Sequence, residues 1–158
     1  MDYRELRDLF GHFPTGVAVA TTIGCEAEKV GVTISSFNSV SLDPGLVMFS
    51  LTNTLFSLPA FVGANAYGIN FLTAEQADLS NRFSRKGTDK WTNTRHSVSA
   101  NGVPLLDDAL AHIECEKFKV IEGGDHLIFL CRVIAYQTFE KTSPLIFFKG
   151  RYRSVEAA

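Results

Sequence analysis

GVTISSFNSVS, residues 31–41, begins with the alternation of a β-strand and continues as a bend rich in hydroxyl groups. Val30, Val32 and Ile34 alternate with small or polar residues, which is the period of a strand with one buried face. The alternation then stops, and hydroxyl side chains dominate up to the turn signal Asp43-Pro44-Gly45. This surface suits a flat, polar-edged heterocycle. The alternative is a serine-rich loop that satisfies its own backbone through local hydrogen bonds.

The composition indicates one globular domain, expected to span residues 1–158. The chain is 46% hydrophobic, and its 13 phenylalanines favour a compact β-rich core. The net charge of −2 argues against binding to nucleic acid or to anionic membranes. No apolar run approaches the roughly 18 residues of a membrane span, and residues 1–5 lack the features of a signal peptide. We therefore expect a cytoplasmic protein.

The cysteines and histidines show no pattern typical of a metal site. Cys25, Cys115 and Cys131 form no CxxC motif, and the four histidines are scattered along the chain. We therefore predict no bound metal ion and three free thiols, with Cys115 and Cys131 on two arms of one hairpin.

Hydrophobic periodicity predicts six or seven strands and two or three short helices. The first helix is expected from Asp2, which has capping-box spacing to Glu5, to about Phe13. The second is expected to run to Phe61 with Asn53 or Thr54 as its cap, and the third to follow a capping box at Thr73. The strands are expected at residues 17–22, 29–35, 46–51, 67–72, 111–122, 127–140 and 144–148. Glycines at 123 and 124 join the two longest strands as a hairpin. Because no regular long helices separate the strands, the predicted fold is mainly β: an antiparallel, Greek-key-like barrel with a few short helices.

Residues 82–91 concentrate positive charge in a chain that is otherwise slightly acidic. Lys90 or Arg85 is a candidate to hold a phosphate, because cations beside loop amides suit that anion. The alternative is a solvated loop whose cations complement the dipole of the preceding helix. Ser57, near the start of a predicted helix, is a second phosphate candidate. The chain has no GxGxxG, GxxxxGK[ST] or GxSxG motif.

His126 follows two glycines and Asp125 at the mouth of the predicted hairpin. The glycines permit close backbone approach, so the imidazole is a candidate to face a ligand. The alternative is a solvent-exposed turn histidine beside an aspartate.

Together these motifs resemble the short-chain flavin reductases, the reductase components of two-component monooxygenases of the 4-hydroxyphenylacetate 3-monooxygenase type. The resemblance runs from about Leu9 to Ser154 and depends on the order and spacing of several short motifs. They are FPTGV (13–17), GVTISSFNSVSLDP (31–44), DKW (89–91), PLL (104–106), GDH (124–126), PL (144–145) and GRY (150–152). The chain departs from the family pattern at Gly45, where a second proline is usual, and at Trp91, where phenylalanine is common.

The resemblance implies a split β-barrel that binds flavin, a homodimer, and reduction of FMN or FAD by NADH or NADPH for a separate monooxygenase component. It implies that His126 lies beside the nicotinamide and that Tyr152 closes that side. The implied wall of the flavin ring and ribityl chain comprises Thr15, Gly16, Thr33, Ser35, Ser36, Phe37, Ser39 and Val40. The implied phosphate end comprises Ser50, Leu51, Ser57, Lys90 and Trp91. The alternatives are a flavin-binding module without turnover and a split-barrel oxidase related to pyridoxine-phosphate oxidase.

Overall fold

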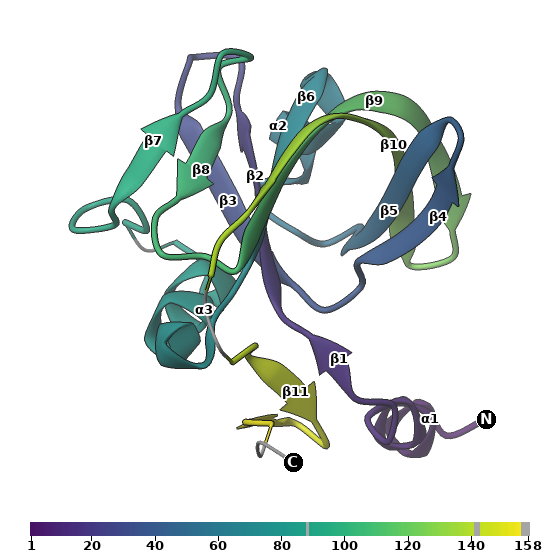
Figure 1. Cartoon of the computed structure of the whole chain (residues 1–158). Helices are drawn as coiled ribbons and strands as arrows, with labels where there is room; N and C mark the ends of the chain where they lie inside the picture. Colours follow the sequence, from purple (N-terminus) through teal and green to yellow (C-terminus); the bar gives the residue numbers. More distant parts are fainter. Residues whose placement is uncertain (88, 141–142, 156–158) are drawn as a thin grey trace.

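Seven antiparallel strands form one curved sheet that winds into an open barrel (Figure 1). The computed structural model describes residues 1–87, 89–140 and 143–155. The order across the sheet is β3-β2-β6-β9-β10-β5-β4. These strands are β2 (Ala18–Ile23), β3 (Lys29–Ile34), β4 (Asn38–Leu42), β5 (Gly45–Thr52), β6 (Ala66–Phe71), β9 (Ala111–Gly123) and β10 (His126–Thr138). The prediction of a mainly β, antiparallel fold is confirmed.

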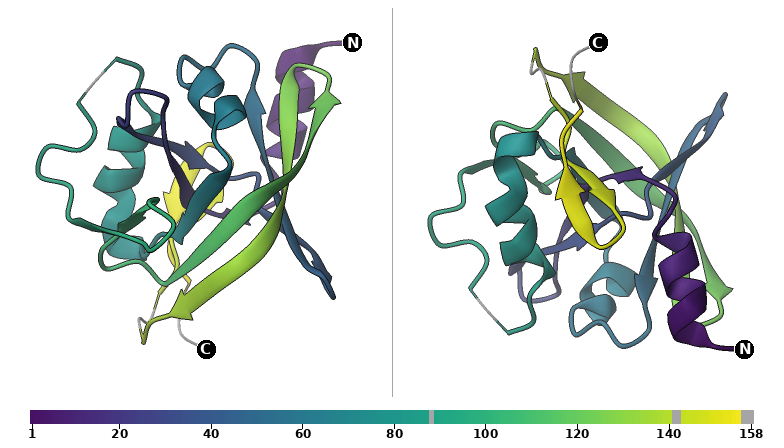
Figure 2. Two further views of the ribbon diagram at one scale, coloured as in Figure 1. Left: turned by 90° about the horizontal axis from the view of Figure 1, so that it is seen from above. Right: turned by 90° about the horizontal axis from the view of Figure 1, so that it is seen from below.

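Two smaller sheets accompany the barrel. One pairs β7 (His96–Val98) with β8 (Pro104–Leu106), and β7 lies in a segment where no helix or strand is predicted. The other contains β1 (Thr15–Gly16), β11 (Ile146–Phe148) and β12 (Arg151–Arg153). Figures 1 and 2 show this second sheet beneath the barrel, with the β11–β12 hairpin between helices α1 (Tyr3–Phe10) and α3 (Ala77–Ser84). We call α1, β1, β11 and β12 the lower lobe.

The helices are short: α1 (Tyr3–Phe10), α2 (Leu58–Gly63) and α3 (Ala77–Ser84), with a 3-10 turn at Ala74–Gln76 before α3. Asp2 caps α1 by accepting a hydrogen bond from the Arg4 amide at 2.8 Å, and the capping box at Thr73 is present. Both cap predictions are confirmed. Among the described residues, no helix combines the length and apolar character needed to cross a bilayer.

Two helix boundaries differ from the prediction. The first helix ends at Phe10, because tight turns follow in which the His12 and Phe13 amides bond to carbonyls only three residues back. The second helix begins after Ser57, and the prediction that Asn53 or Thr54 caps it is wrong. Asn53 instead donates to the tip of the β9–β10 hairpin, from its side chain to the Gly124 carbonyl at 3.2 Å.

Aromatic rings fill the barrel interior. Phe49 and Phe129 stack with ring centroids 5.0 Å apart, and Phe61 and Tyr67 pack around them. The Tyr67 hydroxyl donates to the Phe61 carbonyl at 2.8 Å, and burial raises the pKa of this phenol. These contacts hold the side of the barrel on which β5 and β10 lie.

Cys115 and Cys131 lie fully buried in the same core, and all three cysteines are free, as predicted. A hydrogen bond with Cys131, together with burial, raises the pKa of the Cys115 thiol. Cys115 therefore remains a protonated and unreactive thiol at neutral pH.

The first half of GVTISSFNSVS forms β3 with the predicted facing. Val30, Val32 and Ile34 pack against the barrel core. Gly31 lies on the opposite face, where an added Cβ would sit 2.5 Å from the ring of Phe83 on α3. Glycine at this position therefore lets α3 approach the end strand of the sheet closely.

The long hairpin is confirmed, with 13 residues in each strand. Gly123 pairs with His126, so the turn itself consists of Gly124 and Asp125, and Gly124 adopts a left-handed φ of +73°. Because β10 also pairs with β5, His126 lies opposite Thr52 at the end of the sheet. His126 therefore begins a strand that is paired on both sides.

Candidate functional site

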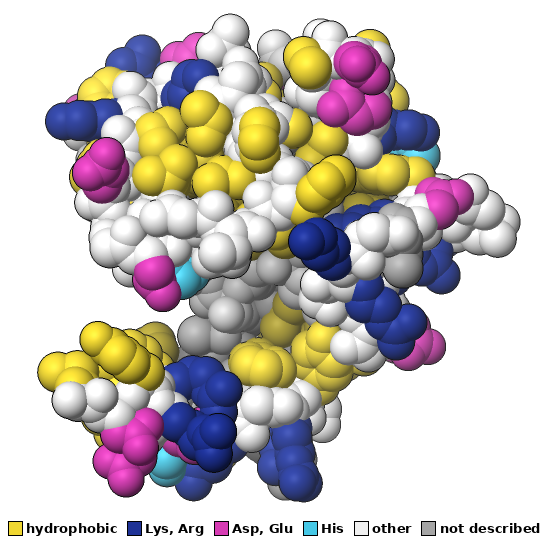
Figure 3. All heavy atoms as spheres, turned by 180° about the vertical axis from the view of Figure 1, so that it is seen from behind, with side chains coloured by type: hydrophobic (Ala, Val, Ile, Leu, Met, Phe, Trp, Pro, Cys, Tyr) yellow, Lys and Arg dark blue, Asp and Glu magenta, His cyan; other side chains and the backbone are white. Residues whose placement is uncertain are grey.

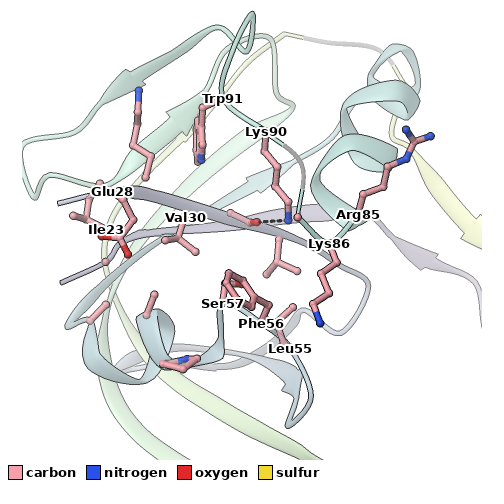
Figure 4. Close-up of a pocket in the computed structure, with 18 of the residues that line it drawn as sticks. Ile23, Glu28, Val30, Leu55, Phe56, Ser57, Arg85, Lys86, Lys90 and Trp91 are labelled. Atoms are coloured by element: carbon pink, nitrogen blue, oxygen red, sulfur yellow. Dashed lines mark hydrogen bonds between the residues drawn. The ribbon is translucent and has the colours of Figure 1, made fainter. Parts of the chain in front are cut away.

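A cavity of about 760 Å³ opens beside β3, the end strand of the large sheet (Figure 4). Its other walls are the turn between β2 and β3, the loop from β5 into α2 together with α2, and the segment that follows α3. Because β3 ends the sheet, its outward backbone groups face this cavity rather than another strand. A ligand here meets both backbone and side-chain partners.

Lys90 forms hydrogen bonds to backbone carbonyls at the edge of the cavity. Its Nζ donates to the Gly31 carbonyl at 3.1 Å and to the Phe83 carbonyl at 2.9 Å. In an antiparallel ladder a residue directs its N–H and C=O to the same side, so the backbone groups of Gly31 and Thr33 point away from β2. Burial lowers the pKa of Lys90. One of its three N–H donors remains for an anion.

The charges around the cavity are predominantly positive. Four cations line it (Lys29, Arg85, Lys86 and Lys90), against two carboxylates (Glu28 and Asp89). Asp89 is turned toward its own loop, where it accepts hydrogen bonds from the Trp91 amide at 2.9 Å and the Thr92 amide at 3.1 Å. The Thr92 hydroxyl bonds to the same carboxylate and lowers the pKa of Asp89. The cavity therefore attracts an anion such as a phosphate.

Trp91 forms an aromatic wall of the cavity. Its ring packs edge-on against Phe83 at 5.1 Å and His96 at 5.0 Å between centroids. Lys29 Nζ lies 5.6 Å from the centre of the indole and 3.0 Å from His96 Nε2. These contacts hold Trp91 in a fixed orientation.

Side chains of the hydroxyl-rich stretch at residues 31–41 form hydrogen bonds to neighbouring elements of the barrel. Ser36 Oγ donates to the Ser50 carbonyl and accepts from the Ser50 amide, both at 3.0 Å. Thr33 Oγ1 donates to the Ser80 carbonyl at 2.6 Å. These two hydroxyls bond to backbone groups of neighbouring elements. The alternative, that the loop forms only local hydrogen bonds with its own backbone, is therefore wrong for them. The bend continues as strand β4 from Asn38.

The structure brings together only some of the predicted ligand-contacting residues. The 760 Å³ cavity collects Ser57, Lys90 and Trp91, and a second cavity of about 300 Å³, lined by apolar residues, collects Gly16 and Phe37. The other predicted residues lie outside both cavities: Thr15, Thr33, Ser35, Ser36, Ser39, Val40, Ser50, Leu51, His126 and Tyr152.

The exposure of these outer residues differs. Ser35, Ser39 and Val40 are exposed and form an open surface along the bend. Leu51 is only 3% exposed and packs in the core, so its backbone alone is able to face a ligand. Ser57 lines the cavity and makes no side-chain capping bond to α2.

His126 lies at the hairpin tip beside a carboxylate. Its Nδ1 is 2.7 Å from Asp125 Oδ1, and this contact lowers the pKa of Asp125. The histidine side chain is 42% exposed and the aspartate 91%. Asp125 therefore orients the imidazole and leaves Nε2 for another partner.

Ser80 on α3 is a site residue that sequence reasoning missed. It is fully buried, its carbonyl accepts from Thr33, and its Oγ accepts from the Tyr152 hydroxyl at 2.8 Å. It thereby ties β3 to the lower lobe. A single serine within a helix gives no sequence signal for such a role. Lys29 and Lys86 were also missed as cavity cations, although Lys86 belongs to the basic segment identified from the sequence.

Comparison with known protein families identifies the chain, because the flavin reductase like domain matches residues 10–156. The chain belongs to this family. It is 38% identical over 149 residues to the reductase component of the flavin-dependent trigonelline monooxygenase of Acinetobacter baylyi, covering 94% of this chain and 48% of that protein. It is 35% identical over 156 residues to HsaB, a flavin-dependent monooxygenase reductase subunit of Rhodococcus jostii, covering 99% of this chain and 80% of that protein.

The fold is likewise that of the family. The NADH:FAD oxidoreductase SgcE6 of Streptomyces globisporus superposes with a TM-score of 0.94 at 33% identity, covering 99% of this chain and 95% of SgcE6. The chain spans about half the length of the Acinetobacter relative. The resemblance and the split-barrel fold inferred from the sequence are both confirmed.

Proposed function

We propose that this protein is an NAD(P)H:flavin oxidoreductase that reduces FMN or FAD and supplies the reduced flavin to a separate monooxygenase. The observation that supports this most directly is the cation-lined cavity beside the open edge of β3, next to the hydroxyl-rich bend of the flavin reductase family. The similar proteins of Acinetobacter and Rhodococcus are reductase components of flavin-dependent monooxygenases, which supports a monooxygenase partner for this protein.

The residues present fit a flavin phosphate. The Ser57 hydroxyl, the free N–H of Lys90 and the exposed cations Arg85 and Lys86 surround one end of the cavity. Charge-assisted hydrogen bonds from such groups are the strong contacts that phosphates make with proteins. These residues would hold the phosphate and so fix the position of the rest of the molecule.

A bound flavin supplies the hydride-accepting chemistry, and the protein supplies orientation. In our proposal the exposed surface of Ser35, Ser39 and Val40 faces the ring, and His126 orients the nicotinamide. Tyr152 holds the lower lobe against α3 through Ser80 and Asn81, at 2.8 and 3.1 Å. Placement of the two rings is the main contribution required of these side chains.

The reductase proposal is tested by mixing the purified protein anaerobically with NADH or NADPH and with FMN, FAD or riboflavin. We expect nicotinamide oxidation that depends on added flavin. Flavin binding without nicotinamide oxidation would instead identify a flavin-binding protein without turnover. Oxygen-dependent product formation in the absence of nicotinamide would identify a split-barrel oxidase.

We further propose a homodimer, because the apolar face of α1 lacks a partner within the described chain. No residue of α1 is buried: Leu9 and Phe10 are 63% and 66% exposed, and Phe13, three residues after the helix ends, is 76% exposed. Figure 3 shows apolar side chains gathered at one end of the lower lobe. A second copy offers the same apolar helix to cover this face.

Sedimentation equilibrium tests the dimer. We expect twice the 17.4 kDa mass of the chain, and we expect Phe10→Glu to shift the protein toward monomer. Val98→Glu is the matched control, since Val98 is 60% exposed on β7, outside the lower lobe. A wild-type monomer, or a Phe10→Glu dimer as tight as wild type, would contradict this use of α1.

We also propose that the protein is cytoplasmic, because a reducing compartment suits its free thiols.

A further inference from the structure

We propose that this chain takes FAD in preference to FMN, because its cavity continues beyond the phosphate position into a compartment that fits an adenosine. This inference rests on the proposed function and names the flavin that the same site prefers. We call the compartment the adenosine pocket; it is lined by Ile23, Cys25, Glu28, Gly63 and Ala64.

The cavity extends away from the cationic end. Figure 4 shows Arg85 and Lys86 at one side of the cavity and Ile23 and Glu28 at the other, with Ser57 between them. The turn between β2 and β3 and the last turn of α2 enclose this second side. A ligand whose phosphate meets the cations therefore has room beyond that phosphate.

The size of the cavity supports the same conclusion. No residue of the bend from 35 to 41 lines it, so a flavin ring on that bend lies outside the 760 Å³. Only the chain that leaves the ring enters the cavity. A volume of this size corresponds to a whole drug-sized ligand, whose pockets span roughly 300–1,000 Å³. A ribityl phosphate alone would leave much of it unfilled, whereas the additional AMP part of FAD would occupy it.

The lining suits a nucleoside. Ile23 and Ala64 offer apolar contact to a base, and glycine at 63 leaves open space, since an added Cβ there meets nothing within 4 Å. Glu28 accepts the Glu26 amide at 2.9 Å through Oε2, which leaves Oε1 to accept from ribose hydroxyls. Carboxylates bind the ribose of dinucleotides in this way in other folds.

Gly63→Phe tests the proposal, because its ring would occupy the adenosine pocket without a backbone clash. Titration of flavin fluorescence measures the affinity for FAD and FMN directly, without turnover. We expect wild type to bind FAD about tenfold more tightly than FMN, and Gly63→Phe to lose this preference through a weaker affinity for FAD. Val62→Phe is the matched control: Val62 is the preceding residue of α2, is 41% exposed, and does not line the cavity.

The outcomes separate this inference from the proposed function. Equal affinity of wild type for FMN and FAD, or an unchanged preference in Gly63→Phe, overturns the FAD inference even if NADH oxidation proceeds. A preference that Gly63→Phe abolishes, without NADH oxidation by wild type, supports the adenosine pocket and overturns the reductase proposal. Thermal unfolding of both variants confirms that each is folded.

Discussion

His126→Ala is expected to lower kcat/KM for NADH about 100-fold while leaving the affinity for flavin unchanged. The imidazole lies at the tip of the β9–β10 hairpin, outside the cavity that collects the phosphate candidates. Asp125 engages Nδ1, so in our proposal Nε2 is the atom that faces the nicotinamide nucleotide. Loss of the ring would therefore disturb the placement of the nicotinamide and not that of the flavin.

The measurement is steady-state NADH oxidation together with a flavin fluorescence titration of the same variant. Asp125→Asn is the matched control, and we expect a smaller loss because the imidazole itself remains. The contact with His126 lowers the pKa of Asp125, so this carboxylate stays charged at pH values below those at which an ordinary aspartate becomes protonated, and it loses its charge only as the pH falls through the lowered value. Asp125→Asn should therefore remove a negative charge at every pH between about 6 and 8. An unchanged KM and kcat for NADH in His126→Ala would exclude the orienting role.

The fold was largely predictable because its signals are local. The alternation through Val30, Val32 and Ile34 placed one face of β3 in the core, and the glycines before Asp125 placed the long hairpin. The cap at Asn53 was mispredicted because its side chain bonds to Gly124, a partner 71 residues away. Local capping rules do not include such a competitor.

The site was predictable only in part, because it depends on contacts between distant segments. The basic segment indicated an anion site, but Lys90 also bonds to the carbonyl of Gly31, 59 residues earlier, which no local pattern reveals. The roles of the predicted flavin and nicotinamide residues stay predictions. Of these, Ser57, Lys90 and Trp91 share one cavity, which gives the phosphate assignment its geometric support.

Lys90→Met is expected to separate the structural and ligand-binding roles of this lysine. Two carbonyls of buried residues, Gly31 and Phe83, would lose their hydrogen-bond donor, so the free energy of unfolding should fall by about 1–3 kcal/mol. If the remaining N–H also binds a phosphate, the Kd for FMN should rise about tenfold while that for riboflavin, which has no phosphate, stays constant. Urea denaturation and fluorescence titration with both flavins measure the two effects.

Lys86→Met is the matched control for this experiment. Lys86 lines the same cavity, is exposed and bonds to no backbone carbonyl in the described chain, although its Nζ lies 6.0 Å from the Phe56 ring. Its replacement should weaken FMN binding while changing stability by less than about 0.5 kcal/mol. An equal loss of FMN and riboflavin affinity in Lys90→Met would show that Lys90 acts only by holding the edge of β3. Binding of the phosphate would then depend on Arg85, Lys86 and Ser57, whose side chains form no hydrogen bond to β3 in the described chain.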